Sequence, residues 1–242
     1  MIGYDKRSVY YDIVLDLPFR EGTRTITKDI AKPHHPLTMN DPGGGSFTWD
    51  NMLLSGCPYL EFVTIGGGAT DGVYLDCPAA DTGDLDFTTE DYSVCGWINW
   101  DSTWGLSEMI IDRGGVDLDG WDLYLNISGG LNTLSQRHHH TPGRSECFSV
   151  GWTPGTWWFF SMSRVGIITQ HYRNCVPLVM DYGGLTMLDP DTCNRDLVIG
   201  TRYTKDANWY IGMMWRPRVW ARALSMWEWK LLFEMERHLF GV

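Results

Sequence analysis

Glycine and proline divide the sequence into short apolar and aromatic segments, and only one segment, near the C-terminus, has a helical pattern. Antiparallel β-sandwiches typically have strands at such spacing, joined by turn residues and without alternating helices. We therefore expect an all-β fold, and we interpret residues 1–242 as one domain whose core covers about 10–225. The expected strands are 11–19, 72–77, 91–100, 108–113, 121–127, 155–164, 167–173, 197–200 and 210–220.

The segment after the last expected strand predicts a surface helix over about residues 226–238. Ser225 and Glu228 have the S-x-x-E spacing of a capping box. In this motif the side chain of each residue accepts a hydrogen bond from the backbone N–H of the other. Trp229 and Leu232 then fall on one face of the helix, which we expect to pack on the sandwich.

Two other regions predict long loops. Residues 29–50 contain three prolines and a run of three glycines, and residues 128–146 are rich in Gly, Ser and His. The second region includes His138, His139 and His140. Consecutive side chains diverge in direction, so three adjacent histidines do not readily face one ion. We interpret them as part of a solvated loop.

The net charge and the N-terminal sequence argue against some partners and some locations of the protein. Lys and Arg number 19 against 30 Asp and Glu, a net charge of -11, whereas affinity for nucleic acids depends on clustered basic side chains. The N-terminal segment lacks the features of a secretory signal, and no run reaches the roughly 20 apolar residues of a membrane helix. We expect no nucleic-acid partner and no membrane insertion. Without a signal, the chain either stays in the cell that makes it or leaves inside an assembled particle.

Tryptophan is unusually frequent, with 13 residues. Tryptophan is enriched at protein interfaces, and its ring face can stack on a sugar. Four of these side chains fall at expected loops or rims and are candidates for contact with a glycan or a protein partner: Trp100, Trp104, Trp209 and Trp215. Ordinary core packing is the alternative for each of them.

We find no motif for catalysis. A glycoside hydrolase needs two carboxylates that flank the scissile bond, and no E-x-D-x-E triplet is present. Asp84 with Asp86, and Asp117 with Asp119, have the spacing that places two side chains on one face of a strand. Both pairs lie in expected turns, where Asp is common for backbone reasons. We therefore predict no catalytic residue.

The order of several loose motifs resembles that of the laminin-G-like, concanavalin-A-like jelly-roll superfamily, as found in bacterial and phage proteins. The motifs are DIVLDLPFREGTRT, LDFTTEDYSVCGWINWD, RGG followed by GWDLYL, VGWTPGTWWFFSMSRVGIITQHYRN, and YIGMMWRPRVWARALSMWEW. They cover roughly residues 10–240. The resemblance implies a jelly-roll sandwich of two antiparallel sheets packed face to face, and the helix predicted above would lie on its surface.

The resemblance also suggests two candidate sites. Many members of this superfamily bind one calcium ion at the rim of the sandwich, where Asp112, Asp117 and Asp119 could donate oxygen ligands. Turn formation is the alternative for these residues, so we expect either no cofactor or calcium. Cys175 stands in a hairpin turn where relatives usually have glycine. It is a candidate for a disulfide between chains if its thiol points to solvent, and a tolerated replacement otherwise.

A jelly roll without catalytic carboxylates is usually an interaction module. Relatives of this kind are frequent in phage structural proteins, which suggests a decoration protein on the surface of a virion head or tail. Such a protein would be made in the host cytoplasm, bind other virion proteins, form an oligomer and hold host glycans. The alternative is a free, extracellular lectin-like module, and a glycoside hydrolase is the third hypothesis.

Overall fold

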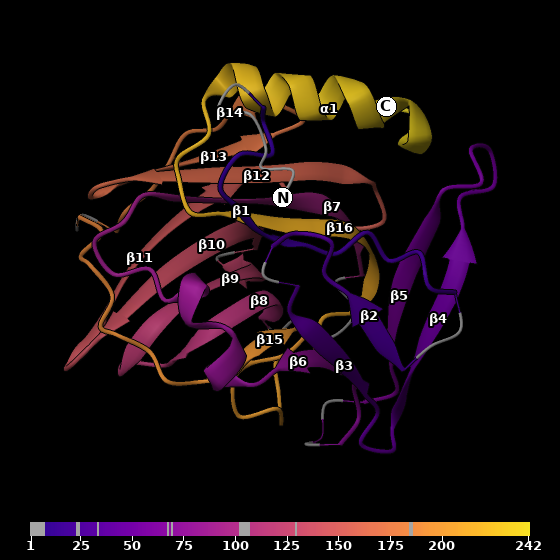
Figure 1. Cartoon of the computed structure of the whole chain (residues 1–242), viewed down its shortest axis with the longest axis horizontal. Coiled ribbons are helices and arrows are strands. Elements are labelled where there is room, and N and C mark those ends of the chain that lie inside the picture. The colour runs from indigo at the N-terminus through magenta and orange to yellow at the C-terminus, as the bar shows by residue number, and fades with distance from the viewer. Residues whose placement is uncertain are drawn as a thin grey trace.

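The computed structural model describes residues 8–22, 25–32, 34–66, 68, 70–101, 107–128, 130–183 and 186–242. Two antiparallel sheets of eight strands each pack face to face, and one long helix lies across the outer face of one of them (Figure 1). We call the sheet under the helix the helix-bearing sheet and the other the opposite sheet. This architecture confirms the predicted two-sheet sandwich with a C-terminal surface helix.

The helix-bearing sheet contains β1 (Ile13–Asp16), β4 (Gly45–Asn51), β5 (Pro58–Thr64), β7 (Tyr92–Trp100), β12 (Trp158–Val165), β13 (Ile168–Arg173), β14 (Val176–Pro177) and β16 (Gly212–Trp220). Its strand order is β14-β13-β12-β7-β16-β5-β4, and β1 also pairs with β16. The opposite sheet contains β2 (Ile26–Lys28), β3 (Pro36–Asn40), β6 (Tyr74–Cys77), β8 (Glu108–Gly115), β9 (Asp119–Ser128), β10 (Leu131–His140), β11 (Gly143–Val150) and β15 (Leu197–Ile199). Its order is β11-β10-β9-β8-β15-β6-β3-β2. The described helices are η1 (Ala79–Asp81), η2 (Gly83–Leu85) and α1 (Met226–Phe240).

Side chains on the two faces of the helix-bearing sheet belong to two separate apolar cores. In β7, Val94 and Ile98 face the opposite sheet and join the apolar core between the sheets. Cys95 and Trp97 face the other way and join a second cluster beneath α1. Successive side chains of a strand point to opposite faces, so one strand contributes to both cores.

Helix α1 begins where the sequence predicts, at the capping box. The Ser225 hydroxyl accepts from the Glu228 N–H, and the Glu228 carboxylate accepts from the Ser225 N–H, which together form the capping box. Gly241 ends the helix with a φ of 70°, a conformation that glycine adopts without steric cost. The helix thus extends two residues past the expected end, to Phe240.

The prediction of a loop over residues 29–50 is wrong, because β3 and β4 lie in this range. Pro36 is the first residue of β3, a position that tolerates proline. Gly45 begins β4, where an added Cβ would lie 2.5 Å from the Val63 carbonyl oxygen of the neighbouring strand. Here the glycine permits close strand packing, whereas we had interpreted it as a loop residue. The strand β5 was not predicted.

The prediction of a loop over residues 128–146 is also wrong, because β10 and β11 form a hairpin there. His138 and His139 are buried and hydrogen-bonded instead of solvated, whereas His140 is half-buried and its Nε2 has no partner among the described residues. His138 Nε2 lies 2.9 Å from the Tyr92 hydroxyl and its Nδ1 lies 2.8 Å from the Leu188 carbonyl oxygen. His139 Nε2 lies 2.9 Å from Asp122. Polar residues of this hairpin therefore form hydrogen bonds inside the protein, and their presence does not indicate a loop.

Candidate binding cleft

An open cleft lies on the outer face of the helix-bearing sheet, beyond the C-terminal end of α1. Phe240, the last residue of the helix, stacks on Trp97 with a ring separation of 4.0 Å. Asn99 is the next residue of β7 on the same face, because side chains alternate along a strand. The helix therefore covers this face as far as Trp97 and leaves the part from Asn99 onward uncovered.

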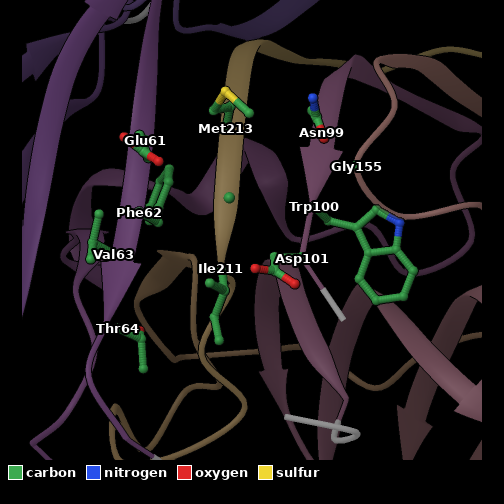
Figure 2. Close-up of a pocket in the computed structure, with 11 residues that line it drawn as sticks. Glu61, Phe62, Val63, Thr64, Asn99, Trp100, Asp101, Gly155, Ile211 and Met213 are labelled. Carbon is green, nitrogen blue, oxygen red and sulfur yellow. The ribbon is translucent and has the colours of Figure 1, made fainter. Parts of the chain in front are cut away.

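Three adjacent strands form the floor of the cleft. Met213 of β16 pairs with Glu61 of β5 on one side and with Asn99 of β7 on the other. Directly paired side chains lie about 5 Å apart at Cβ, so these three form a row across the sheet. Figure 2 shows Glu61 and Met213 on neighbouring strands, with Asn99 beyond them. The cleft has a volume of about 710 Å³ and is lined by Glu61, Phe62, Val63, Thr64, Asn99, Trp100, Asp101, Gly155, Ile211, Gly212 and Met213.

Glycine keeps the centre of this floor open. Gly212 has a φ of 126°, and an added Cβ would lie 2.4 Å from the Asn99 carbonyl oxygen. A side chain there would both strain the backbone and collide with β7. Gly155 lies at the edge of the cleft, where its N–H donates to the Trp100 carbonyl oxygen at 2.9 Å.

The polar side chains of the cleft have free hydrogen-bonding capacity. Within the described ranges, the side chains of Glu61, Asn99 and Asp101 form no hydrogen bond or ion pair. Asp101 is exposed, and Glu61 and Asn99 are half-buried. Polar groups that the fold does not use are the usual means by which a site orients a ligand.

A buried carboxyl group supports the cleft from below. Glu108 of β8 is 2% exposed, and its Oε2 accepts from the Ile211 N–H at 3.1 Å. Burial, with a smaller effect from Asp101, raises the pKa of Glu108 to about 9. The group is therefore neutral near pH 7. It positions Ile211, whose carbonyl oxygen in turn accepts from the Asp101 N–H at 2.9 Å.

The described tryptophans that the sequence suggested as contact residues are buried. Trp100 is 1% exposed and lies in the core between the sheets, and Figure 2 shows its ring to the side of the row formed by Glu61 and Met213. Trp209 is 4% exposed, and its Nε1 donates to the Gly68 carbonyl oxygen at 3.0 Å. Trp215 is 1% exposed and lies beneath α1. Trp104 lies outside the described residues. None of the three described rings offers a free face to a ligand.

The structure does not bring the proposed calcium ligands together. Asp112 is 1% exposed, accepts from the Tyr203 N–H at 2.9 Å, and has a pKa raised by burial and by the neighbouring carboxylate of Asp122. Asp117 pairs with Arg144 at 3.0 Å, and Asp119 pairs with Arg195 at 2.7 Å. No three His, Cys, Asp or Glu residues in the described ranges are grouped to hold a metal ion.

The other acidic pair has roles in the backbone framework. Asp84 lies 2.9 Å from Nε2 of the buried His35, whose Nδ1 lies 2.8 Å from Asp29. The two carboxylates raise the pKa of His35 to about 9 against the opposing effect of burial. Asp86 accepts from the Cys193 N–H at 2.7 Å. These contacts tie loops to the sheets.

Cys175 lies in a hairpin turn, as expected, but its thiol is not free in solvent. Asn174 and Cys175 have φ angles of 48° and 63°, the positive values of a two-residue turn between strands. The side chain is half-buried against α1, and burial raises the pKa of its thiol to about 12. All six cysteines are free in this structure. A disulfide between chains through Cys175 therefore stays a prediction.

The chain is similar in fold to solved binding domains of botulinum neurotoxins and of Paraclostridial Mosquitocidal Protein 1. The binding domain of Paraclostridial Mosquitocidal Protein 1 is 11% identical, with a TM-score of 0.68 over 97% of this chain and 56% of that one. A botulinum neurotoxin type C structure, described in terms of cell entry that depends on two ganglioside molecules, is 12% identical, with a TM-score of 0.63 over 96% and 53%. The binding domain of botulinum neurotoxin DC in complex with SialylT is 12% identical, with a TM-score of 0.62 over 94% and 52%.

At these identities the similarity shows the fold, and this chain spans about half the length of each neighbour. The two-sheet sandwich is thus confirmed, whereas the particular superfamily suggested by the motifs is not. No protein-family model and no curated protein matches the sequence. No helix in the described part of the chain has the length and apolar character needed to cross a bilayer.

Proposed function

We propose that this chain is a non-catalytic carbohydrate-binding module and that the cleft between β5 and β7 holds the glycan. The observation that carries the proposal is the row of Glu61, Met213 and Asn99, continued by Asp101. It places unpaired carboxylates and an amide beside an apolar side chain in an open cleft. Sugar hydroxyls need donors and acceptors, and the C–H faces of a sugar ring need apolar contact. A volume of about 710 Å³ is in the range of ordinary ligand sites.

The structural neighbours support a binding role. The binding domain of botulinum neurotoxin DC was solved in complex with SialylT, and cell entry of botulinum neurotoxin type C depends on interaction with two ganglioside molecules. The match covers about half of each neighbour, so the assignment of a glycan to this chain is our proposal. It rests on the cleft and draws only its ligand class from those proteins.

A glycan array followed by titration calorimetry tests the proposal. We expect binding of at least one glycan class, and Glu61→Gln and Asn99→Ala should each weaken it about tenfold, which corresponds to the loss of about 1.4 kcal/mol. Asp81→Asn, which changes an exposed carboxylate in η1, is the matched control and should bind as the unmodified chain does. The proposal fails if no glycan binds, or if the cleft variants and the control bind equally.

The same cleft identifies the two carboxylates that a glycoside hydrolase would use, if the hydrolase alternative is correct. Glu61 and Asp101 are the only carboxylates among the described residues that line it. Glu61 lies on β5 and Asp101 directly follows β7, and these two strands flank β16. A retaining glycosidase needs its two carboxyl groups about 5 Å apart. If a polysaccharide panel released reducing ends, and Glu61→Gln or Asp101→Asn abolished the release, the module would be an enzyme.

A virion location is a finer proposal about where the module is carried. In this proposal the chain decorates a phage head or tail, with other virion proteins as partners, and presents the cleft to host glycans. Its support is the resemblance of the motif order to phage proteins. Mass spectrometry of purified particles tests it, since a decoration protein should be present at a fixed ratio to the major capsid or tail protein.

A further inference from the structure

Helix α1 carries a second apolar stripe on the side that faces away from the sheet. Trp227, Leu231 and Met235 are 71%, 50% and 51% exposed. Residues four apart lie on the same side of a helix, so these three form a continuous ridge. The helix packs on the sheet through a different face, which includes Trp229 and Leu232, and the fold does not require the ridge. An exposed Trp flanked by Leu and Met is typical of a protein interface.

The charges that flank this ridge have a specific order. Lys230 and Glu234 are one turn apart on the same flank, where they border a groove of about 300 Å³ beside Cys175, Val176 and Phe233. Lys230 Nζ lies 5.8 Å from the centre of the Trp227 ring, which keeps the ammonium next to the ridge. Glu234 Oε2 also accepts from Arg237 Nε of the same helix at 2.7 Å, and both side chains of this pair are nearly half exposed. Along one edge of the apolar stripe, a basic residue is thus followed four residues later by an acidic one, whose exposed carboxylate can contact a second basic group through its other oxygen.

Two copies of α1 related by a two-fold axis have complementary charges along this edge. When two copies of a helix pack antiparallel about such an axis, the same flank of each copy meets and the sequence direction is reversed. An axis between Leu231 and Leu232 therefore brings Lys230 of each copy close to Glu234 of the other. It also places Trp227 against Met235, a contact that favours sulfur beside an aromatic ring. The same stripe on each of the two copies therefore forms both sides of the interface.

We propose that the outer face of α1 is the interface with a second copy of this chain, formed by an antiparallel helix pair. The hairpin between β4 and β5 extends the surface, because Leu53 and Leu54 at its tip are 98% and 93% exposed. The Ser55 hydroxyl donates to the Leu239 carbonyl oxygen at 2.7 Å, which holds the tip beside the C-terminal end of the helix, as Figure 1 shows. The antiparallel arrangement brings this tip to the N-terminal end of the other copy's helix. The proposal is independent of the glycan cleft.

Sedimentation velocity of the full chain over a concentration series tests the interface through its charges. The unmodified chain should dimerise, and Lys230→Glu or Glu234→Lys alone should raise the dimer dissociation constant at least about tenfold, because like charges then meet. The double variant Lys230→Glu with Glu234→Lys should restore dimerisation. A mixture of the two single variants should form a heterodimer, since all its facing charges are opposite. A parallel helix pair or a contact elsewhere would show neither rescue.

A matched pair of leucines separates the stripe from general surface hydrophobicity. Leu231→Gln should abolish the dimer, whereas Leu131→Gln, which changes a leucine 56% exposed at the start of β10, should leave it intact. Circular dichroism checks that both variants fold. The proposal is overturned if the unmodified chain stays monomeric at concentrations up to about 100 µM, or if both leucine variants affect association equally.

Discussion

The outer face of the helix-bearing sheet has two parts built from the same strands, one covered by α1 and one uncovered. In the covered part, Trp97 and Arg218 are fully buried, and both contact Glu236 of the helix. In the uncovered part, Glu61 and Asn99 have the same outward direction, but within the described ranges their side chains have no partner. The position at which α1 ends therefore decides whether an outward side chain stabilises the fold or is free for a ligand.

The covered part is held by a buried ionic network as well as by aromatic packing. The Arg218 guanidinium donates to both oxygens of Glu236, at 2.8 and 2.9 Å, and the Trp97 indole N–H donates to Glu236 at 2.9 Å. Burial acts to lower the pKa of Arg218, but the neighbouring Cys95 and the carboxylates of Glu236 and Asp16 raise it above its ordinary value. Arg216 pairs in the same way with Asp16 of β1. A paired ion of this kind is costly to separate from its partner.

The largest effect should follow from removing Glu236. Glu236→Ala leaves the buried Arg218 charge without its partner and the Trp97 indole without an acceptor, so the free energy of unfolding should fall by about 3 to 5 kcal/mol. Urea denaturation followed by Trp fluorescence measures this. Asp81→Ala is the control, with an expected change within about 0.5 kcal/mol. A loss below 1 kcal/mol for Glu236→Ala would mean that α1 is held by its aromatic contacts alone.

The second prediction moves the boundary between the two parts. Phe240 is 7% exposed and stacks on Trp97 at the last turn of the helix. Phe240→Ala should cost about 3 kcal/mol, the lower end for a large buried aromatic ring, and should expose the Trp97 ring beside Asn99. A red shift of Trp fluorescence in the folded state reports that exposure. Val242→Ala is the control, since Val242 is 38% exposed after the helix end, and it should shift neither quantity.

The sequence predicted the covered part better than the uncovered part. The capping box, the buried face with Trp229 and the two-sheet class follow from local patterns, because each depends on residues close in the chain. The cleft does not, because Glu61 lies on β5, a strand that the sequence patterns do not predict. Asn99 shows the limit most clearly. Alternation in residues 91–100 gives its outward direction, but only the tertiary contact between Phe240 and Trp97 shows that the helix stops there.

The rim tryptophans failed as candidates for a related reason. Trp100 lies at the end of one expected strand and Trp215 in the middle of another, and the exposure of each ring depends on what packs over it. The opposite sheet covers the first and α1 covers the second. We chose these tryptophans because of their large rings. The groups that are available to a ligand are instead the polar side chains of the cleft, Glu61, Asn99 and Asp101, which have no partner among the described residues.

A third prediction concerns the buried carboxyl beneath the uncovered part. The pKa of Glu108 is raised to about 9, so between pH 4.5 and 9 the folded state binds more protons than the unfolded state. Stability should therefore decrease as pH rises through this range, by at most about 1.4 kcal/mol per pH unit. Glu108→Gln keeps an acceptor for the Ile211 N–H and should remove this slope, so that it exceeds the unmodified chain in stability at pH 8. Denaturation at pH 5 and pH 8 measures the difference, and identical slopes would place a charged Glu108 in the folded protein.

The smallest change in stability should come from the cleft row itself. Glu61→Ala and Asn99→Ala remove side chains that have no described partner, so the free energy of unfolding should change by no more than about 0.5 kcal/mol. Thermal denaturation with and without a bound glycan then separates the two roles of the sheet. A ligand at 100 times its dissociation constant stabilises the unmodified chain by about 2.7 kcal/mol, and this increment should shrink in both variants. If either substitution instead destabilised the free chain by several kcal/mol, the row would be part of the framework, and the covered and uncovered parts would not differ in kind.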